Sequence, residues 1–219
     1  MKHLRWFLNA IFKLAVSDGL VLSNPAAELR IPKKCRPGRA MRPLTEEEVM
    51  DYLEVFDLRE RLIARLAVFE GLRPGEIFAI RWKAVRNDAI RAERRVYKRI
   101  FDTPKNGKTR EVAISDGTSE LLKEWHDLAE DPSPEGFVFP SETLVTSLSA
   151  DNLWRRTMKP RLAKVGLGWA TFQVLRKTNA SLSKKAVSIR RSHRTRGATV
   201  SASAWRCIPV RTWSRSGKQ

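Results

Sequence analysis

The stretch GLRPGEIFAIRW, residues 71–82, places a cation and an acid one helical turn apart. Arg73 directly precedes Pro74, and proline is favoured in the first turn of a helix, so we expect Arg73 at a helix start. Glu76 follows three residues later, one helical turn away. A cation and an acid thus stand together at a predicted break between two helices, and their placement there calls for an explanation.

The charge of the whole chain favours a polyanionic partner. The 219 residues, enough for a substantial core, include 42 Lys and Arg against 24 Asp and Glu, which gives a net charge of +18 and an isoelectric point near 10.6. Such a field attracts nucleic acid most simply. A basic ribosome-type protein, or charge that serves solubility alone, is the alternative that composition leaves open.

The sequence gives no sign of a metal, a cofactor, a small-molecule substrate or a membrane span. Two cysteines, Cys35 and Cys207, lie too far apart for a zinc motif. Metal-ligand spacing is also missing among the histidines, which are His3, His126 and His193. No apolar run approaches the roughly 20 residues that a membrane helix needs. We therefore expect a cytoplasmic protein without a cofactor.

Hydrophobic periodicity predicts a mainly α protein with a small antiparallel β-sheet, an α+β fold. Thr45 and Glu48 form a predicted capping box at the start of the main helical unit, and Gly71 is expected to end its second helix. The predicted helices span residues 4–17, 43–56, 58–71, 74–82, 118–130, 149–166 and 171–185. The predicted strands span residues 89–101 and 110–115, and residues 136–140 are predicted to be a short buried strand or loop.

These elements fall into four predicted regions. Residues 1–33 would be a partial helical domain with too few helices to be complete, and residues 34–43 a basic linker. Residues 44–185 would be the main domain, and residues 186–219 an aberrant, disordered basic tail. The stretch 30–43 holds six Lys and Arg, three Pro and no acid. Five of its cations are predicted to bind DNA phosphates: Lys33, Lys34, Arg36, Arg39 and Arg42.

Three motifs in order resemble the tyrosine recombinase (phage integrase) family. GLRPGEIFAIRW resembles the first arginine box, with Arg73 as its arginine and Glu76 as the acid beside it. TPKNGKTREVAIS resembles the hairpin that carries the family's catalytic lysine, with Lys105 at the matching position. FQVLRKT resembles the second box, His-x-x-Arg, with Arg176 as its arginine. The resemblance covers about residues 5–185 and implies an incomplete catalytic-domain fold after a partial core-binding domain.

The resemblance implies a definite chemistry. A tyrosine of the family attacks a DNA phosphate and leaves a 3′-phosphotyrosyl bond. Arg73 and Arg176 would clamp the charge of the transition state. Lys105, with Lys108 as a nearby rival, would protonate the leaving 5′-oxygen. The implied partners are double-stranded DNA and other recombinase protomers.

The sequence departs from the family at two places. Gln173 occupies the position of the second-box histidine; it can donate a hydrogen bond but cannot act as an acid or base. The family's nucleophile lies beyond the second box, whereas the two tyrosines here, Tyr52 and Tyr97, both precede Arg176. We expect both to serve packing, so the chain has no candidate nucleophile.

The tail suggests a reason for the missing tyrosine. Residues 187–219 contain seven Arg, one Lys and no acid, without helical or strand periodicity. When it is back-translated and read from the third base of each codon, the segment from Ala186 permits GVDPKVASDQRGHG…GVSMEVYTRSDLEQK. This string resembles the family's Gly-His element and tyrosine block. We hypothesise that one deleted base at codon 186 produced the tail, which would make the gene a pseudogene of a mobile element.

Three functions follow from these patterns. The first is site-specific recombination, with the chain itself inactive unless a partner supplies a tyrosine. The second is DNA binding without chemistry, by a remnant of an integrase. The third is RNA binding, which is disfavoured because no known RNA-binding module is recognisable.

Overall fold

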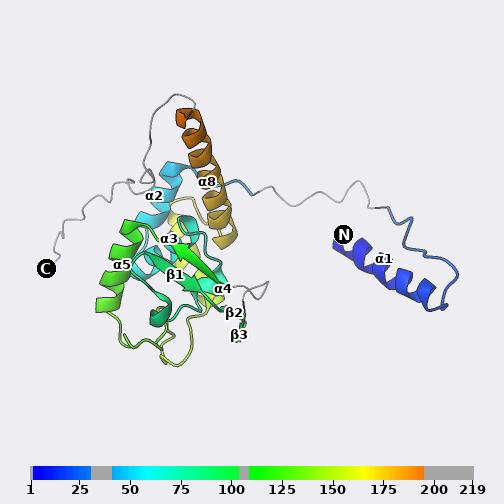
Figure 1. Cartoon of the computed structure of the whole chain (residues 1–219), viewed down its shortest axis with the longest axis horizontal. Helices are drawn as coiled ribbons and strands as arrows, with labels where there is room; N and C mark the ends of the chain where they lie inside the picture. The colour runs from blue at the N-terminus through cyan, green and yellow to red at the C-terminus, as the bar shows by residue number, and fades with distance from the viewer. Residues whose placement is uncertain (1, 31–40, 104–108, 195–219) are drawn as a thin grey trace. The chain divides into compact units, whose positions relative to one another are not determined.

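The structure is a computed structural model that describes residues 2–30, 41–103 and 109–194 (Figure 1). Two compact units divide the chain, Met1–Met41 and Arg42–Gln219. Their boundary falls inside the predicted linker of residues 34–43. In the described ranges, no helix has the length and apolar character of a membrane span.

The first unit contains the predicted N-terminal helix, α1 (Lys2–Ser17). The chain leaves the helix at Gly19, whose φ of +71° suits a residue without a side chain. The apolar stripe that predicted this helix is more than half exposed, because the described part of this unit offers no second helix to cover it. The exposed members of the stripe are Leu4, Phe7, Ile11 and Leu14, whereas Leu8, its fifth member, is partly buried.

The second unit begins with two helices that the sequence predicted. α2 (Glu46–Glu54) starts at the capping box: the Thr45 N–H donates to Glu48 Oε2 at 2.9 Å, and the Glu48 N–H donates to Thr45 Oγ1 at 3.2 Å. α3 (Leu58–Val68) is buried along most of its length and ends before Gly71, where φ is +64°. α3 forms the middle of the core, since it packs against both α5 and α8.

The helix predicted over residues 74–82 is wrong in its second half. α4 (Pro74–Ile77) makes one turn, and the 3-10 helix η1 (Trp82–Ala84) follows after a segment that turns at Phe78 and Ala79 and is extended at Arg81. Within this stretch Arg81 forms an isolated antiparallel bridge with Phe137, and the Trp82 N–H donates to a carbonyl of the 136–140 segment at 3.0 Å. Tertiary pairing thus replaces the hydrogen bonds of a longer helix.

The strand predicted over residues 89–101 is also divided. It becomes β1 (Ala89–Ala92), β2 (Arg95–Tyr97) and β3 (Ile100–Asp102). β2 and β3 pair as a hairpin around Lys98 and Arg99, whose φ angles of 48° and 67° form a two-residue turn. This turn could not be predicted from the residue types, because neither Lys98 nor Arg99 is the Gly or Asn that such turns favour.

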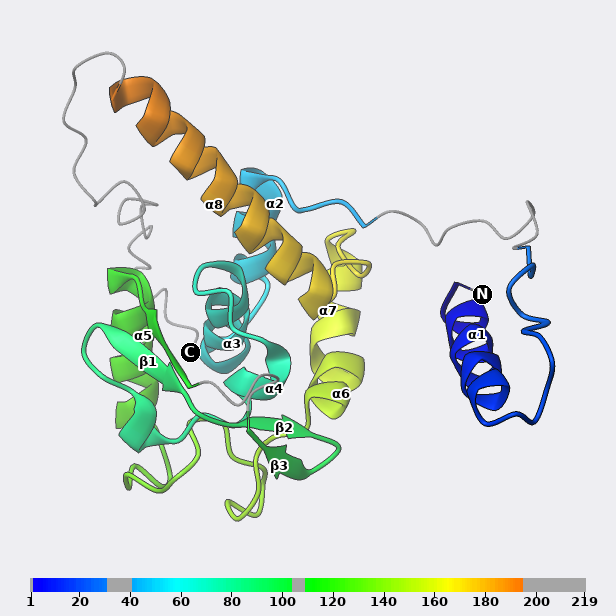
Figure 2. The same ribbon diagram turned by 45° about the vertical axis from the view of Figure 1, so that its right-hand side comes forward.

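β4 (Arg110–Ala113) lies within the second predicted strand and pairs antiparallel with β1. The side chains of Ile90 and Val112 are directly opposite one another and are buried, so one face of this pair packs on the core. β1, β4 and the β2–β3 hairpin together confirm the small antiparallel component of the fold (Figure 2).

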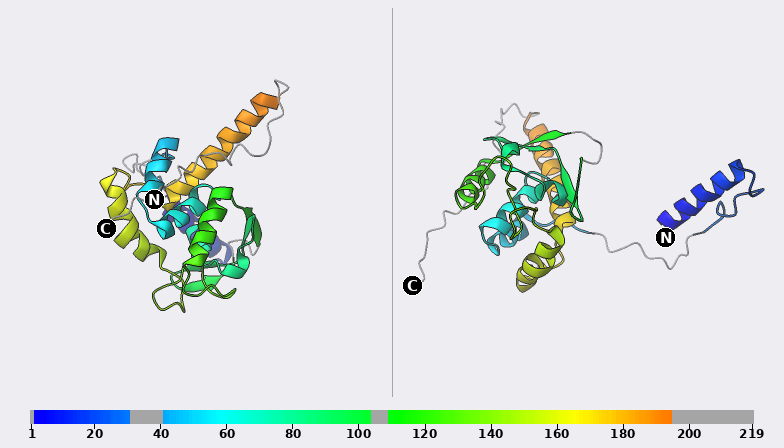
Figure 3. Two further views of the ribbon diagram at one scale, coloured as in Figure 1. Left: turned by 90° about the vertical axis from the view of Figure 1, so that its left-hand side faces the viewer. Right: turned by 90° about the horizontal axis from the view of Figure 1, so that it is seen from below.

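The remaining helices complete the α+β fold. α5 (Asp116–Asp127) follows β4; α6 (Ala150–Leu153), a π-helical turn (Trp154–Met158) and α7 (Lys159–Lys164) form one nearly continuous helical stretch. α8 (Phe172–Arg194) runs nine residues past the boundary predicted at residue 185, and its end projects from the unit (Figure 3). The expectation of disorder therefore does not hold for residues 186–194; residues 195–219 lie outside the described ranges.

Candidate functional site

Arg73 and Glu76 meet as their spacing predicted. Arg73 is the residue before α4, with φ −77° and ψ 149°. Its Nη1 donates to Glu76 Oε1 at 2.8 Å, and its backbone N–H donates to Glu76 Oε2 at 2.8 Å. The Glu76 side chain is 2% exposed, whereas that of Arg73 is 48% exposed. The buried carboxylate therefore holds the arginine while leaving much of its guanidinium open to solvent.

A second arginine, Arg110 of β4, binds the same carboxylate. Its Nη2 donates to Glu76 Oε2 at 2.8 Å, and its side chain is 43% exposed. Sequence analysis predicted the strand but missed this residue. The available signal was the alternation of a strand: Val112 faces the core, so Arg110, two residues earlier, shares its face.

Arg176 comes from α8, more than 100 residues away along the chain, and joins the group through the loop before α4. Its Nη1 donates to the carbonyl oxygen of Gly71 at 2.9 Å. Burial lowers the pKa of the Arg176 guanidinium, and the charges of Arg73 and Arg110 lower it further, against the opposite influence of Glu76. An arginine remains protonated in spite of such shifts. The effect shows that the three cations lie close enough to repel one another.

We call Arg73, Arg110 and Arg176 with Glu76 the arginine cluster. Burial acts to raise the pKa of Glu76, but hydrogen bonds from the Arg73 backbone and from the Arg110 and Arg73 side chains lower it below its ordinary value. Glu76 is therefore ionised at neutral pH, and the cluster carries an excess of two positive charges. An anion such as a phosphate would offset this excess.

The fold and these residues now permit comparison with known proteins. The model of the phage integrase family matches residues 39–193, well over half of the chain. The chain belongs to the phage integrase family. The resemblance to tyrosine recombinases in the sequence is thus confirmed. In the comparison with curated proteins, no match was found.

Solved integrase structures share the fold. The Tn1549 transposon integrase, in complex with a circular intermediate DNA, has a TM-score of 0.70 at 15% identity, over 84% of this chain and 66% of that one. A lambda integrase dimer bound to a COC′ core site has a TM-score of 0.59 at 19% identity, over 98% of this chain and 61% of that one. XerA recombinase has a TM-score of 0.54 at 21% identity, over 85% of this chain and 62% of that one. The chain thus spans slightly less than two thirds of these integrases.

Gln173, predicted to occupy the position of the second-box histidine, lies in the first turn of α8 and is exposed. It precedes Arg176 by three residues, so both side chains leave α8 on the same side. Lys105 and Lys108 lie outside the described residues, as do four predicted linker contacts, Lys33, Lys34, Arg36 and Arg39.

Arg42, the described member of the predicted linker contacts, is engaged within the second unit. Its Nη1 and Nη2 donate to the two carboxylate oxygens of Glu48, both at 2.6 Å, and its guanidinium lies 4.4 Å from the ring centroid of Trp169. The hydrogen bond from Arg42 lowers the pKa of Glu48 to about 2. We call these three residues the Arg42 clamp.

The two tyrosines of this chain occupy different environments. Tyr52 is fully buried in α2 against the Phe56 ring, and burial raises the pKa of its hydroxyl. Its predicted packing role is confirmed. Tyr97 is 70% exposed beside the hairpin turn, with the Lys98 Nζ 5.6 Å from its ring centroid. Its predicted packing role is wrong, because β2 ends where the hairpin leaves the core.

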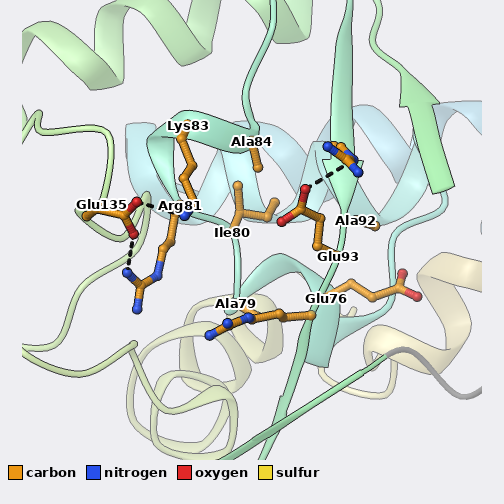
Figure 4. Close-up of a pocket in the computed structure, with 11 residues that line it drawn as sticks. Glu76, Ala79, Ile80, Arg81, Lys83, Ala84, Ala92, Glu93 and Glu135 are labelled. Carbon is orange, nitrogen blue, oxygen red and sulfur yellow. Dashed lines mark hydrogen bonds and ion pairs between the residues drawn. The ribbon is translucent and has the colours of Figure 1, made fainter. Parts of the chain in front are cut away.

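A small cavity borders Glu76 on the side of η1. It encloses about 80 Å³, and Arg81 and Lys83 both donate to Glu135 at its edge, at 2.7 Å (Figure 4). The Glu76 carboxylate points away from this ion pair (Figure 4). Small-molecule pockets usually enclose about 300–1,000 Å³, so this cavity has room for a few waters only. No metal-binding group of His, Cys, Asp or Glu occurs within the described ranges.

Proposed function

We propose that this chain binds double-stranded DNA through the arginine cluster of an integrase catalytic domain, and that it does not break the strand on its own. The observation that carries the proposal is that Arg73 and Arg110 bind one buried carboxylate while Arg176 is held at Gly71, two residues before Arg73, in a sequence with no tyrosine after Arg176. The excess cations suit a DNA phosphate, and the attacking hydroxyl is missing.

Each residue has a role in this proposal. Arg73 and Arg176 bind the non-bridging oxygens of one phosphate with charged N–H donors from two sides, α4 and α8. Gln173 adds a neutral donor. Glu76 touches no DNA; it fixes the guanidinium of Arg73 by two hydrogen bonds. Lys105 is proposed to donate a proton to the leaving oxygen in an intact enzyme.

The structural relatives support the proposed partners. The Tn1549 integrase is described in complex with a circular intermediate DNA, and lambda integrase both as a dimer on a core site and as a tetramer on a Holliday junction. By analogy, we propose that this chain meets duplex DNA and other recombinase protomers. Tn1549 is a transposon, which agrees with a mobile element as the source of the gene.

Neither tyrosine present suits the missing role. The Tyr52 hydroxyl is buried inside the core, where no phosphate can reach it. Tyr97 is exposed, but it belongs to the β2–β3 hairpin rather than to a segment after α8. We propose that the frame-shifted tail, not a different mechanism, explains this absence.

Binding is tested by titrating the full chain into a fluorescein-labelled duplex of about 30 base pairs and following anisotropy at increasing NaCl. We expect affinity to fall steeply with salt, because each phosphate contact releases counterions. A binding curve unchanged between about 50 and about 200 mM NaCl would refute the DNA-binding proposal.

Strand breakage is tested separately with a nicked duplex that traps covalent protein–DNA adducts. No adduct is expected from the chain alone. If an adduct forms and is lost in Tyr97→Phe, the hairpin tyrosine is the nucleophile and the proposed inactivity is wrong. Sequencing the DNA that encodes residues 180–219 tests the frameshift: stop codons in the shifted frame, or no tyrosine codon there, would disprove it.

A further inference from the structure

We propose that Arg110 is a third phosphate-binding arginine of the site: it holds Glu76 in place and also donates to a DNA phosphate. This inference rests on the proposed DNA binding and adds a residue to the pair that the family's two arginine boxes supply. A salt bridge that only fastens β4 to α4 is the alternative, and three features of the structure argue against it.

The first feature is the direction of the side chain. Arg110 pairs with Ala92 of β1 and shares a strand face with the buried Val112. Alternation therefore turns Arg110 toward the core side of the sheet, and the small side chain opposite leaves room for its long stem. The Arg110 side chain reaches Glu76, and its guanidinium therefore lies on the same carboxylate as the guanidinium of Arg73.

The second feature is the unused capacity of the guanidinium. An arginine offers five N–H donors, and the bond to Glu76 engages the Nη2 group. With 43% of the Arg110 side chain exposed, donors remain open to solvent, almost as for Arg73 at 48%. Arg110 and Arg73 bind the same buried carboxylate, so one phosphate could accept from the donors that remain on both.

The third feature is the balance of charge. Glu76 uses both oxygens on Arg73 and Arg110, so it neutralises one charge among three. Burial lowers the pKa of the Arg176 guanidinium, and the neighbouring charges of Arg73 and Arg110 act in the same direction. Placing another cation here costs free energy in the free protein, and a bound phosphate would recover it.

The test compares Arg110→Ala with a matched control, Arg86→Ala, in the full chain. Arg86 Nη1 binds Glu111 Oε1 at 2.8 Å, the same distance as the Arg110 pair, with 56% of its side chain exposed. Glu111 follows Arg110 on β4, so this pair lies on the opposite face of the strand. Arg110→Ala removes a half-exposed cation from β4 itself, and Arg86→Ala removes one from the segment before β1 that binds the next residue of β4.

In the anisotropy titration, Arg110→Ala is expected to weaken duplex binding about tenfold and to reduce the slope of log affinity against log salt by about 1. Arg86→Ala should change affinity by less than about twofold. Arg110→Lys keeps the charge, so the salt slope should return to the wild-type value, while the affinity stays below that of wild type. Equal affinities and slopes for Arg110→Ala and Arg86→Ala would overturn the inference and leave the DNA-binding proposal intact. If Arg110→Ala does not fold, as circular dichroism would show, a wild-type affinity in Arg110→Lys would overturn it.

A second measurement separates this inference from the proposed function. If the wild-type chain binds no duplex, the proposed function fails, and stabilisation of the chain by inorganic pyrophosphate in thermal unfolding decides the inference. A rise in Tm for wild type and Arg86→Ala, but not for Arg110→Ala, would support it. No rise in wild type, or an equal rise in all three, would overturn it.

Discussion

The arginine cluster and the Arg42 clamp both contain arginine bound to glutamate, yet they differ in how many cations share one carboxylate. In the Arg42 clamp one guanidinium meets one carboxylate through two hydrogen bonds, and the aromatic ring of Trp169 covers it. In the arginine cluster two guanidinium groups share Glu76, and a third, that of Arg176, is held nearby by the Gly71 carbonyl. The first arrangement is complete within the protein; the second lacks an anion. Local charge balance, rather than the number of basic residues, distinguishes a structural arginine from one that is available to DNA.

The largest expected effect is the loss of stability on removing Glu76, compared with the loss on removing Glu48. Glu76→Ala should lower the free energy of unfolding by about 2–3 kcal/mol, because it leaves two arginines and a backbone N–H without their buried acceptor. Glu48→Ala should cost less, about 1 kcal/mol, since both Arg42 and the Thr45 N–H of the capping box can turn to water. Urea unfolding of both variants measures the difference. Equal losses would mean that the clamp is as essential to the fold as the cluster.

DNA affinity gives the second contrast. Arg73→Ala and Arg176→Ala should each weaken duplex binding about tenfold or more, because each removes charge-assisted bonds to phosphate. Arg42→Ala should change affinity by less than about twofold, although the sequence predicted Arg42 as a DNA contact. Anisotropy at fixed salt measures all three. A loss for Arg42→Ala as large as for Arg73→Ala would show that DNA displaces Glu48 from the Arg42 clamp.

The third contrast is the loss of stability at acid pH. The folded-state pKa of Glu48, about 2, lies below its ordinary value of 4.5, so the folded chain binds fewer protons than the unfolded chain between these values. This contribution is complete above pH 4.5 and is lost as the pH falls toward 2. Glu48→Gln should therefore flatten the fall in Tm across this range, relative to wild type. Glu135→Gln is the control: hydrogen bonds from Lys83 and Arg81 also lower the pKa of Glu135, but because these ion pairs are exposed this variant should flatten the fall less. An identical flattening would remove the special role of Glu48.

The smallest expected effect concerns the ring beneath Arg42. Trp169→Leu keeps an apolar side chain but removes the cation–π contact of 4.4 Å, and should lower Tm by about 1–2 °C without changing DNA affinity. Differential scanning calorimetry measures the shift. Trp169→Phe should recover part of it. A change in DNA affinity would instead place Trp169 in the binding surface.

Local signals predicted those parts of the molecule that depend on neighbouring residues. The capping box of Thr45 and Glu48, the helix end at Gly71 and the pairing of Arg73 with Glu76 all lie within three or four residues, where spacing fixes geometry. Errors arose where distant segments compete with a local pattern. The helix after Ile77 is replaced by pairing with the 136–140 segment, and the strand of residues 89–101 folds back at Lys98.

The sequence by itself determined the family, the α+β class, the two arginine boxes and the lack of a tyrosine after Arg176, because each depends on residue identity and order. The tertiary structure alone decided which cations share a site. In the folded chain Arg176 donates to the Gly71 carbonyl, and Arg110 donates to Glu76. Arg42 instead binds Glu48 and packs over the Trp169 ring. The physical reason is that burial and charge balance are set by contacts between segments far apart in the chain, which no local spacing records.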